Sequence, residues 1–426
     1  MMTDILPALT AFARSVFRDE AVANPTSSVQ FRGIRGPDNV LRELEYFSSF
    51  FSPYQDATAP ILKLVFADPD FASIAPRNGE HYPYLCHPGG GQRLLSESLI
   101  VQLLSSALVK MYVLRLPHDE DSFITTVLKG FEALRCAAKG EKIDSYVITG
   151  LAGITLPEGG QISTPWGVVR PAGPIRFTRR VDAGNVLDTS CVLGELRKVS
   201  VLFDRAPDPV HPPFDKADID AISGRSFHLL ALACVLASEG ILVPGAPIMT
   251  WSTFCLSFFA ETGCLLPRLP GNYPKEVDLS DRIPEIEEWA QVVNDVHVSS
   301  VDISAKKLVS AVGHRLDPGD ALIDAVIVWE NLLGTKNEVT FRVSAALAKL
   351  LECDASTRVA LQKRLTKIYN LRSRLVHGDS IDPTELWKAS EGAIVVAIKA
   401  LRASYKKGTD WLSLSSEKRS NRILLE

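Results

Sequence analysis

Residues 354–385 read DASTRVALQKRLTKIYNLRSRLVHGDSIDPTE, and this stretch predicts a long helix, a tight turn and the start of a second helix. Asp354 or Ser356 can cap the long helix, because a side-chain oxygen at this position accepts hydrogen bonds from the unpaired N–H groups of the first turn. The helix is expected to run to about His377. Gly378 follows it, and glycine readily adopts the left-handed conformation that ends many helices.

Similar signals occur on both sides of this stretch. They are Asp317-Pro318 before a predicted helix over 318–333, Gly334 after it, Asn337 before a helix over 338–351, and Asp382-Pro383-Thr384-Glu385 before a helix over 383–405. Aspartate and asparagine are preferred N-caps, and proline suits the first helical position. Shorter helices are expected over 284–296 and 305–313. The short loops predict an all-α, up-down helical bundle over 281–410, followed by a basic tail over 411–426.

The N-terminal 280 residues predict a mixed α+β region that is mostly helical over 1–140 and contains a small antiparallel sheet within 141–280. The expected helices cover 39–51, 93–114, 118–138, 217–239 and 250–262, and the expected strands cover 145–156, 161–171, 175–181 and 192–203. The strand segments are rich in Val, Ile, Thr and Phe and are separated by turns that contain Gly and Pro. A proline-rich stretch over 265–281 has no periodic apolar face, which places a domain boundary near residue 280.

The composition is that of a folded globular chain. Of 426 residues, 46% are hydrophobic and 23% are charged, so disorder over most of the chain is excluded. The net charge is −4, but residues 301–426 hold 20 basic and 15 acidic side chains, a net charge of +5. The C-terminal third is therefore the better candidate for binding a polyanion, although most surface charge is simply solvated.

The seven cysteines, the N-terminus and the hydrophobic runs together predict a soluble, cytoplasmic protein. The cysteine count is odd, the spacing is scattered and no CxxC pair occurs, so a disulfide framework is not expected. No basic segment precedes an apolar core at the N-terminus. The longest apolar run covers residues 229–237, far short of the roughly 20 residues that span a bilayer. No membrane association is expected.

Candidate chemistry lies at the end of the helix quoted above. Arg372, Ser373, Arg374 and His377 crowd its last turns, where the helix carbonyls favour positive charge. Arg372 and His377 lie off the apolar stripe of the helix. Basic residues before a helix-ending glycine are also a common way to end a helix. These residues alone therefore leave a catalytic site and simple helix capping both open.

The segment over 318–405 resembles HEPN domains, specifically the Apea-like HEPN group of bacterial anti-phage defence proteins. The resemblance rests on the R-x4–6-H pattern at Arg372-Ser-Arg-Leu-Val-His377, the upstream sequence AVIVWENLL over 325–333, the amphipathic FRVSAALAKLL over 341–351, and Ile-Tyr-Asn at 368–370. It covers roughly 90–120 residues and does not extend to the N-terminal region. Two positions depart from the family pattern: Ser373 replaces the usual Asn, Asp or His, and Asp379 stands where a regulatory tyrosine often occurs.

The resemblance implies a metal-independent endoribonuclease that acts in a bacterial defence or toxin system. In that chemistry the RNA 2′-hydroxyl attacks the adjacent phosphate, which leaves a 2′,3′-cyclic phosphate and a 5′-hydroxyl. His377 would be the general acid or base and Arg372 the phosphate clamp, with Ser373 and Arg374 in support. No cofactor and no metal are expected. The N-terminal region would sense a trigger, phage-derived or other, or hold the nuclease off. The alternative is a bundle that dimerises or binds RNA or a nucleotide without cleaving it.

Helix geometry adds two expectations about this site. Residues five apart lie about 7.5 Å apart along the axis and about 140° apart around it, so Arg372 and His377 do not share a face. A homodimer through the bundle would bring both pairs into one cleft, as is typical of the family. Ser373 and His377 are four residues apart and do share a face, so the hydroxyl is expected to orient the imidazole.

Glu330 is a further supporting candidate, because it lies on an otherwise apolar predicted helix. A carboxylate in an apolar setting is expected to have a basic partner, since burial without one costs free energy. The candidate partners are Arg342, Arg372 and Arg374. An ion pair that only stabilises the bundle and a supporting role in catalysis both remain open.

Overall fold

The computed structural model describes residues 2–19, 52–77, 83–87, 90–114, 116–172, 178–180, 186–205, 224–238, 245–259, 264–265, 276–335 and 338–425. The chain forms two compact units. Unit 1 comprises Met1–Ala152, Trp166–Arg225 and Met249–Leu269, and unit 2 comprises Gly153–Pro165, Ser226–Ile248 and Pro270–Glu426. Both units are assembled from discontinuous segments, which differs from the single boundary near residue 280 that the sequence predicted.

Unit 1 combines helices with antiparallel strands. Its helices are α1 (Met2–Phe17), α5 (Ala59–Ala67), α6 (Leu99–Val113) and α7 (Glu120–Ala138), with short 3-10 turns at Ser52–Tyr54, Asp56–Thr58, Pro69–Phe71 and Ser96–Ser98. Its strands are β1 (Tyr84–His87), β2 (Gly90–Arg93), β3 (Ile143–Ala152), β6 (Gly167–Pro171), β7 (Thr178–Arg180), β8 (Val186–Asp188), β9 (Cys191–Val199), β10 (Leu202–Asp204), β11 (Ile248–Cys255) and β12 (Cys264–Leu265). The helix predicted over 39–51 lies outside the described residues.

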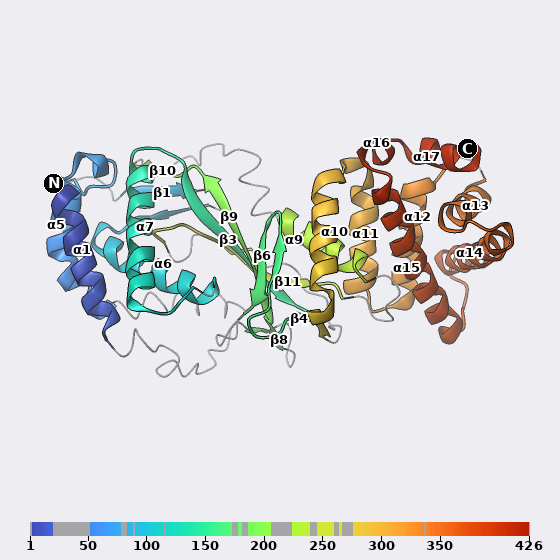
Figure 1. Ribbon diagram of the computed structural model, residues 1–426, viewed down its shortest axis with the longest axis horizontal. Coiled ribbons are helices and arrows are strands. Elements are labelled where there is room, and N and C mark those ends of the chain that lie inside the picture. The colour runs from blue at the N-terminus through green and yellow to red at the C-terminus, as the bar shows by residue number, and fades with distance from the viewer. Residues whose placement is uncertain are drawn as a thin grey trace. The chain divides into compact units, whose positions relative to one another are not determined.

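The main sheet of unit 1 has the strand order β12-β11-β3-β9-β6 (Figure 1). Strands β3 and β9 form a long antiparallel pair from Ile143↔Val199 to Leu151↔Cys191, and β6 pairs with the other edge of β9. Strands β10, β1 and β2 form a second antiparallel sheet. The prediction of a small antiparallel sheet is therefore confirmed.

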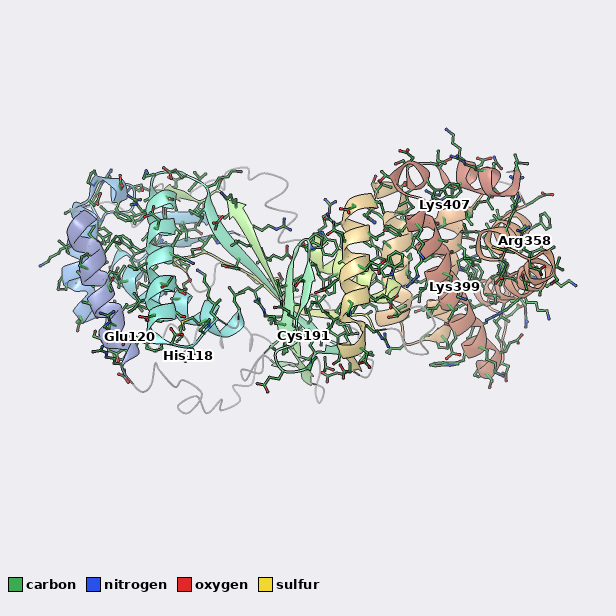
Figure 2. All side chains as sticks on the ribbon, viewed as in Figure 1. His118, Glu120, Cys191, Arg358, Lys399 and Lys407 are labelled. Carbon is green, nitrogen blue, oxygen red and sulfur yellow. The ribbon has the colours of Figure 1, made fainter. Side chains whose placement is uncertain are left out.

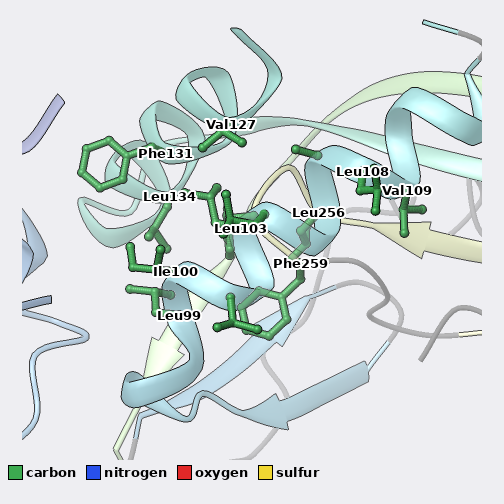
Figure 3. Packing of buried hydrophobic residues seen from close by; sticks show 14 of the residues in the cluster. Leu99, Ile100, Leu103, Leu108, Val109, Val127, Phe131, Leu134, Leu256 and Phe259 are labelled. Carbon is green, nitrogen blue, oxygen red and sulfur yellow. The ribbon is translucent and has the colours of Figure 1, made fainter. Parts of the chain in front are cut away.

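The core of unit 1 lies where α6 and α7 pack against each other and against the sheet. In Figure 3, Val127, Phe131 and Leu134 of α7 lie beside residues 99–103 of α6. The spacing of three and four residues along α7 places these side chains on one face of the helix. Asp119 accepts a hydrogen bond from the Ser122 N–H at 2.7 Å and caps α7, so this helix begins within two residues of its predicted start.

Glu120 joins the start of α7 to the end of α1. Its carboxylate accepts hydrogen bonds from Arg14 Nε at 2.7 Å and from Arg18 Nε at 3.1 Å, and Figure 2 shows it next to the last turn of α1. These two hydrogen bonds lower the pKa of Glu120, although burial opposes them. Because the groups are largely exposed, the pair contributes little to stability and mainly fixes the register of the two helices.

The helix predicted over 250–262 is wrong, because residues 248–255 form strand β11 between β3 and β12. The hydroxyls of this strand explain the difference. Ser252 Oγ lies 3.0 Å from Thr149 Oγ1, and Thr250 Oγ1 lies 2.9 Å from Thr189 Oγ1. β-Branched and small polar residues suit a strand whose partners satisfy their hydroxyls, and those partners lie more than 60 residues away in sequence.

Unit 2 is mostly helical. Its helices are α9 (Arg225–Leu236), α10 (Ile283–Val296), α11 (Asp302–Gly313), α12 (Pro318–Leu333), α13 (Val339–Leu351), α14 (Ala355–Val376), α15 (Pro383–Lys406), α16 (Thr409–Leu412) and α17 (Ser416–Leu425), with 3-10 turns at Ser280–Arg282 and Ser299–Val301 and short strands β4 (Ile154–Thr155), β5 (Ile162–Thr164) and β13 (Val277–Asp278). Helix α12 packs against α11, α13, α14, α15 and α17 (Figure 1). The helical nature predicted for the C-terminal region is confirmed.

The predicted caps begin three of these helices. Asp317, Asp354 and Asp382 each accept backbone hydrogen bonds at the starts of α12, α14 and α15. Asn337, predicted to cap the next helix, lies outside the described residues; α13 instead follows Glu338, which has a positive φ of 51° and makes no side-chain cap. Helix α9 covers Arg225–Leu236 of the helix predicted over 217–239, and residues 217–223 lie outside the described part of the chain.

The predicted basic tail folds as part of unit 2, because Arg419 anchors it. Arg419 is buried in α17 and donates hydrogen bonds of 2.8 Å to the carbonyl oxygens of Asn331, Leu332, Leu412 and Leu414. Burial lowers the pKa of Arg419 to about 10, so the guanidinium remains charged near neutral pH. The last carbonyls of α12 thus find their donors in α17.

A second charged network joins α11 to α12. Asp324 is only 2% exposed, and its carboxylate accepts hydrogen bonds from Lys307 Nζ at 2.7 Å, Ser310 Oγ at 2.8 Å and Arg315 Nε at 2.8 Å. Burial by itself would raise the pKa of Asp324, but these three donors outweigh it and lower the pKa below the ordinary value of 3.8. The buried carboxylate therefore depends on its partners, as buried charges generally do.

No helix within the described parts of the chain combines the length and the apolar content that a membrane crossing requires.

We expect Asp324→Asn to lower the free energy of unfolding by about 2 kcal/mol, because charge-assisted hydrogen bonds from a lysine and an arginine are lost. The native pKa is lowered, so this contribution is present above the ordinary pKa and disappears as the pH falls through the native pKa. Denaturant unfolding at pH 7 and at pH 3 measures both effects. Asp320→Asn, on the exposed side of the same helix, is the control and should change little. Equal stability of wild type and Asp324→Asn at pH 7 would contradict the assignment.

Candidate active site

Helix α14 carries most of the predicted site, and its packing fixes which side chains face inward. Leu365, Ile368 and Leu371 are buried, as the predicted apolar stripe requires. A Cβ atom at position 319 would lie 2.9 Å from a methyl group of Leu375. Glycine at this position therefore lets the start of α12 pack closely against the end of α14.

The end of α14 has the geometry that the sequence predicted. His377 is the C-cap residue, and its backbone N–H donates to the Ser373 carbonyl at 3.1 Å. Gly378 follows with φ of 86°, and its N–H donates to the Leu375 carbonyl at 3.1 Å. The left-handed glycine turns the chain away, so the His377 imidazole is left exposed at the surface of unit 2.

Arg372 lies one and a half turns earlier and is largely buried. Its side chain is 24% exposed, and Nη2 lies 3.9 Å from Glu330 Oε2. Its Nε has no hydrogen-bond partner among the described residues. The guanidinium thus lies at ion-pair distance from the carboxylate of a neighbouring helix, without a hydrogen bond between them.

Glu330 has the basic partner that its position predicted, and that partner is Arg372 rather than the two other candidates. Arg342 donates to the side chain of Asn421, and Arg374 Nε lies 3.3 Å from Asp379 Oδ2. Arg374 is exposed and points to the surface loop, so it does not contact Glu330 or Arg372.

Tyr369 completes this cluster and was not among the predicted site residues. Its hydroxyl donates a hydrogen bond to Glu330 Oε1. Burial raises the pKa of Tyr369, and the adjacent Glu330 carboxylate raises it further, while Arg372 opposes the rise. The sequence does place Tyr369 one helical turn before Arg372, in the Ile-Tyr-Asn stretch. Its hydrogen-bond partner, Glu330, is 39 residues away in the sequence.

The structure therefore brings together Glu330, Tyr369 and Arg372, but it leaves His377 apart from them. Within residues 338–425, no hydrogen bond joins the Ser373 hydroxyl to the His377 imidazole, although the two residues share a helix face. The imidazole is accessible for proton transfer, while Arg372 supplies a fixed positive charge. One copy of unit 2 presents these two groups at different places around α14.

A pocket of about 510 Å³ opens beside Glu330 and Tyr369. It is lined by the end of α12, Val339 at the start of α13, and residues 415–417 at the start of α17. Two carboxylates, those of Glu330 and Glu417, face it. An anionic phosphate would be repelled there, so this pocket is not suited to hold the scissile phosphate by itself.

No group of three or more His, Cys, Asp or Glu residues in the described part of the chain is arranged to hold a metal ion. Comparison with models of known protein families, with curated proteins and with solved structures finds no match.

A double-mutant cycle tests the link between Tyr369 and Glu330. We expect Tyr369→Phe and Glu330→Gln each to lower the free energy of unfolding, and the double mutant to lose less than the sum of the two. Residues that share a hydrogen bond typically show a coupling energy of about 0.5–3 kcal/mol. Urea unfolding of the four proteins gives this energy. Strict additivity would mean that the hydrogen bond does not stabilise unit 2.

Proposed function

We propose that unit 2 contains a HEPN-type domain and that the protein is a metal-independent endoribonuclease of a bacterial defence or toxin system. The observation that carries this proposal is the end of α14. There an exposed histidine caps the helix immediately before a left-handed glycine, five residues after a largely buried arginine. The resemblance of residues 318–405 to the Apea-like HEPN group also supports the proposal.

The proposed reaction needs one group that transfers protons and one that stabilises negative charge. His377 would act as general base or acid at the 2′-hydroxyl or at the leaving 5′-oxygen, because histidine titrates near neutral pH and this imidazole is exposed. Arg372 would bind the oxygens of the phosphorane, on which negative charge develops. Glu330 and Tyr369 would hold the arginine in place, which makes them positioning residues.

The spread of Arg372 and His377 around α14 favours a site shared by two copies. A single straight helix separates these side chains by about 140°, and the described contacts do not join them. A dimer related by a two-fold axis, with the ends of α14 facing each other, would supply arginine from one copy and histidine from its partner. This arrangement also explains why neither the pocket beside Glu330 nor the helix end forms a complete site alone.

The second candidate function is a binding module that holds RNA or a nucleotide without cleaving it. The Arg372–Glu330 pair favours this alternative, because an arginine paired with a carboxylate can serve only to stabilise the helices. In that case His377 would be a simple helix cap. The two functions differ in whether RNA is cut.

We expect the purified protein to cleave RNA in excess EDTA and to leave 2′,3′-cyclic phosphate ends. His377→Ala should lower the rate by about 10²–10⁴-fold because proton transfer is lost, and Arg372→Ala should have a similar effect through lost charge stabilisation. Ser373→Ala should be milder. End-labelled RNA on denaturing gels measures the rate and identifies the ends.

Lys363→Ala is the matched control for these variants, because it removes an exposed cation from the same helix. Its activity should remain near that of wild type. Thermal melting of every variant accompanies the assay, since exposed substitutions usually change stability by only about 0.5 kcal/mol. RNA binding without cleavage by a folded wild-type protein would favour the binding module. Cleavage that stops in EDTA and returns with magnesium would point to a different site.

We expect the active species to be a homodimer. Light scattering at micromolar concentration measures the mass, and mixing inactive subunits tests whether the site is shared. Arg372→Ala protein retains the histidine and His377→Ala protein retains the arginine, so a mixed dimer regains one intact pair. Partial recovery of cleavage on mixing is the expected result. A strict monomer with full activity would exclude the shared site.

A further inference from the structure

A second pocket lies wholly within unit 1 and has a volume of about 560 Å³. It is bounded by the last turns of α6, one side of α7, and the strands β3 and β9. Its volume falls within the range of about 300–1,000 Å³ that is usual for small-molecule sites. Nothing in the proposed nuclease chemistry uses it.

Two glycines allow its walls to come together. A Cβ atom at position 130 would lie 2.4 Å from the Ser257 carbonyl oxygen, so glycine is needed for α7 to approach the segment after β11. A Cβ atom at position 194 would lie 2.9 Å from a methyl group of Leu114, where β9 passes the end of α6. The chain therefore packs closely on two sides of the pocket.

The charged lining of the pocket is mainly positive. Four lysines, Lys110, Lys129, Lys142 and Lys198, face two carboxylates, Glu132 and Asp144. Glu132 is already paired with Arg135 at 2.5 Å, and Asp144 is opposite Lys198 in the β3–β9 register. The excess of cations favours a negatively charged ligand.

Lys110 distinguishes this pocket from an ordinary basic surface. Its side chain is only 4% exposed, yet it lines the pocket, and its ammonium nitrogen lies 6.0 Å from the centroid of the Tyr146 ring. Lysine is rarely buried to this extent. Solvent screens a buried charge only weakly, so Lys110 adds to the positive potential that an anion in this pocket would meet.

The rest of the lining is mostly apolar. Tyr146 and Leu196 are directly opposite each other on β3 and β9, so both side chains lie on the face of the sheet that borders the pocket. Leu196 is 54% exposed and Leu116 is 38% exposed. A ligand with a flat or apolar group would remove this surface from water, at about 25 cal/mol per Å².

We propose that this pocket in unit 1 binds a small organic anion, a phosphate or carboxylate joined to a planar ring, with the anionic group at Lys110 and the ring over Tyr146 and Leu196. Both parts of the ligand are needed, because the cations recognise the charge and the apolar residues recognise the ring. Nucleoside monophosphates belong to this class. The site is independent of RNA cleavage by unit 2.

Isothermal titration with 1-naphthyl phosphate tests the proposal on the full chain, with inorganic phosphate and 1-naphthol as probes of the two halves. We expect one binding site for 1-naphthyl phosphate and at least about tenfold weaker binding of either half. Titration with AMP, GMP, CMP and UMP shows whether a nucleobase serves as the ring. Absence of binding of 1-naphthyl phosphate and of all four nucleotides at millimolar concentration would overturn the proposal.

Variants place the ligand in this pocket. Lys110→Met keeps the length of the side chain and removes its charge, and it should weaken binding of 1-naphthyl phosphate at least about tenfold. Lys198→Met and Leu196→Asp change exposed positions and should also weaken binding of 1-naphthyl phosphate. They replace Lys110→Met as the test if that variant does not fold. Lys63→Met, an exposed lysine on α5, is the matched control and should bind as wild type does. Unchanged affinity in the folded pocket variants would overturn the site. The assay contains no RNA, so its result does not depend on the nuclease proposal.

Discussion

Two carboxylates of α12, the buried Asp324 and the partly exposed Glu330, link this helix to its neighbours in unit 2. Removing a carboxylate from water costs free energy unless cations or hydrogen-bond donors replace the water. Asp324 obtains its donors from α11 and the loop after it, and Glu330 obtains them from Tyr369 and Arg372 of α14. Each carboxylate therefore fixes one neighbouring helix against α12, and the second also fixes the arginine that we propose as the phosphate clamp.

The two groups of the proposed site differ in their surroundings: Arg372 lies next to a carboxylate, and His377 is accessible to solvent. Arg372 is partly buried and lies at ion-pair distance from Glu330, whereas His377 lies beyond the last turn of α14 and is exposed. A fixed cation suits the binding of a phosphate, because its position requires no further ordering. An exposed imidazole suits proton exchange with water between reaction cycles. The pocket that we propose in unit 1 would add a different kind of recognition, through a buried lysine beside an aromatic ring.

The features that the sequence predicted correctly are local ones. The caps at Asp317, Asp354 and Asp382 and the left-handed Gly378 depend on residues within one turn, so their signals lie next to each other in the chain. Strand β11 was predicted as a helix because its hydroxyl partners, Thr149 on β3 and Thr189 just after β8, are distant in sequence and give no local signal. Glu330 could be assigned a basic partner from burial alone, but the choice of Arg372 over two other arginines, and the role of Tyr369, depend on how α12 and α14 cross. Periodicity does not contain that information.

The buried guanidinium of Arg419 has a consequence for the order in which unit 2 can form. It donates hydrogen bonds to the last carbonyls of α12. One of these acceptors, the Leu332 carbonyl, lies 87 residues before Arg419 in the sequence. On the ribosome, α12 is made long before residue 419, so these carbonyls must remain hydrated while the intervening helices emerge. Unit 2 therefore reaches its final hydrogen bonding only late in synthesis. A nascent chain that stops before α17 would lack this anchor, so the end of α12 reaches its final hydrogen bonding only after residue 419 has emerged.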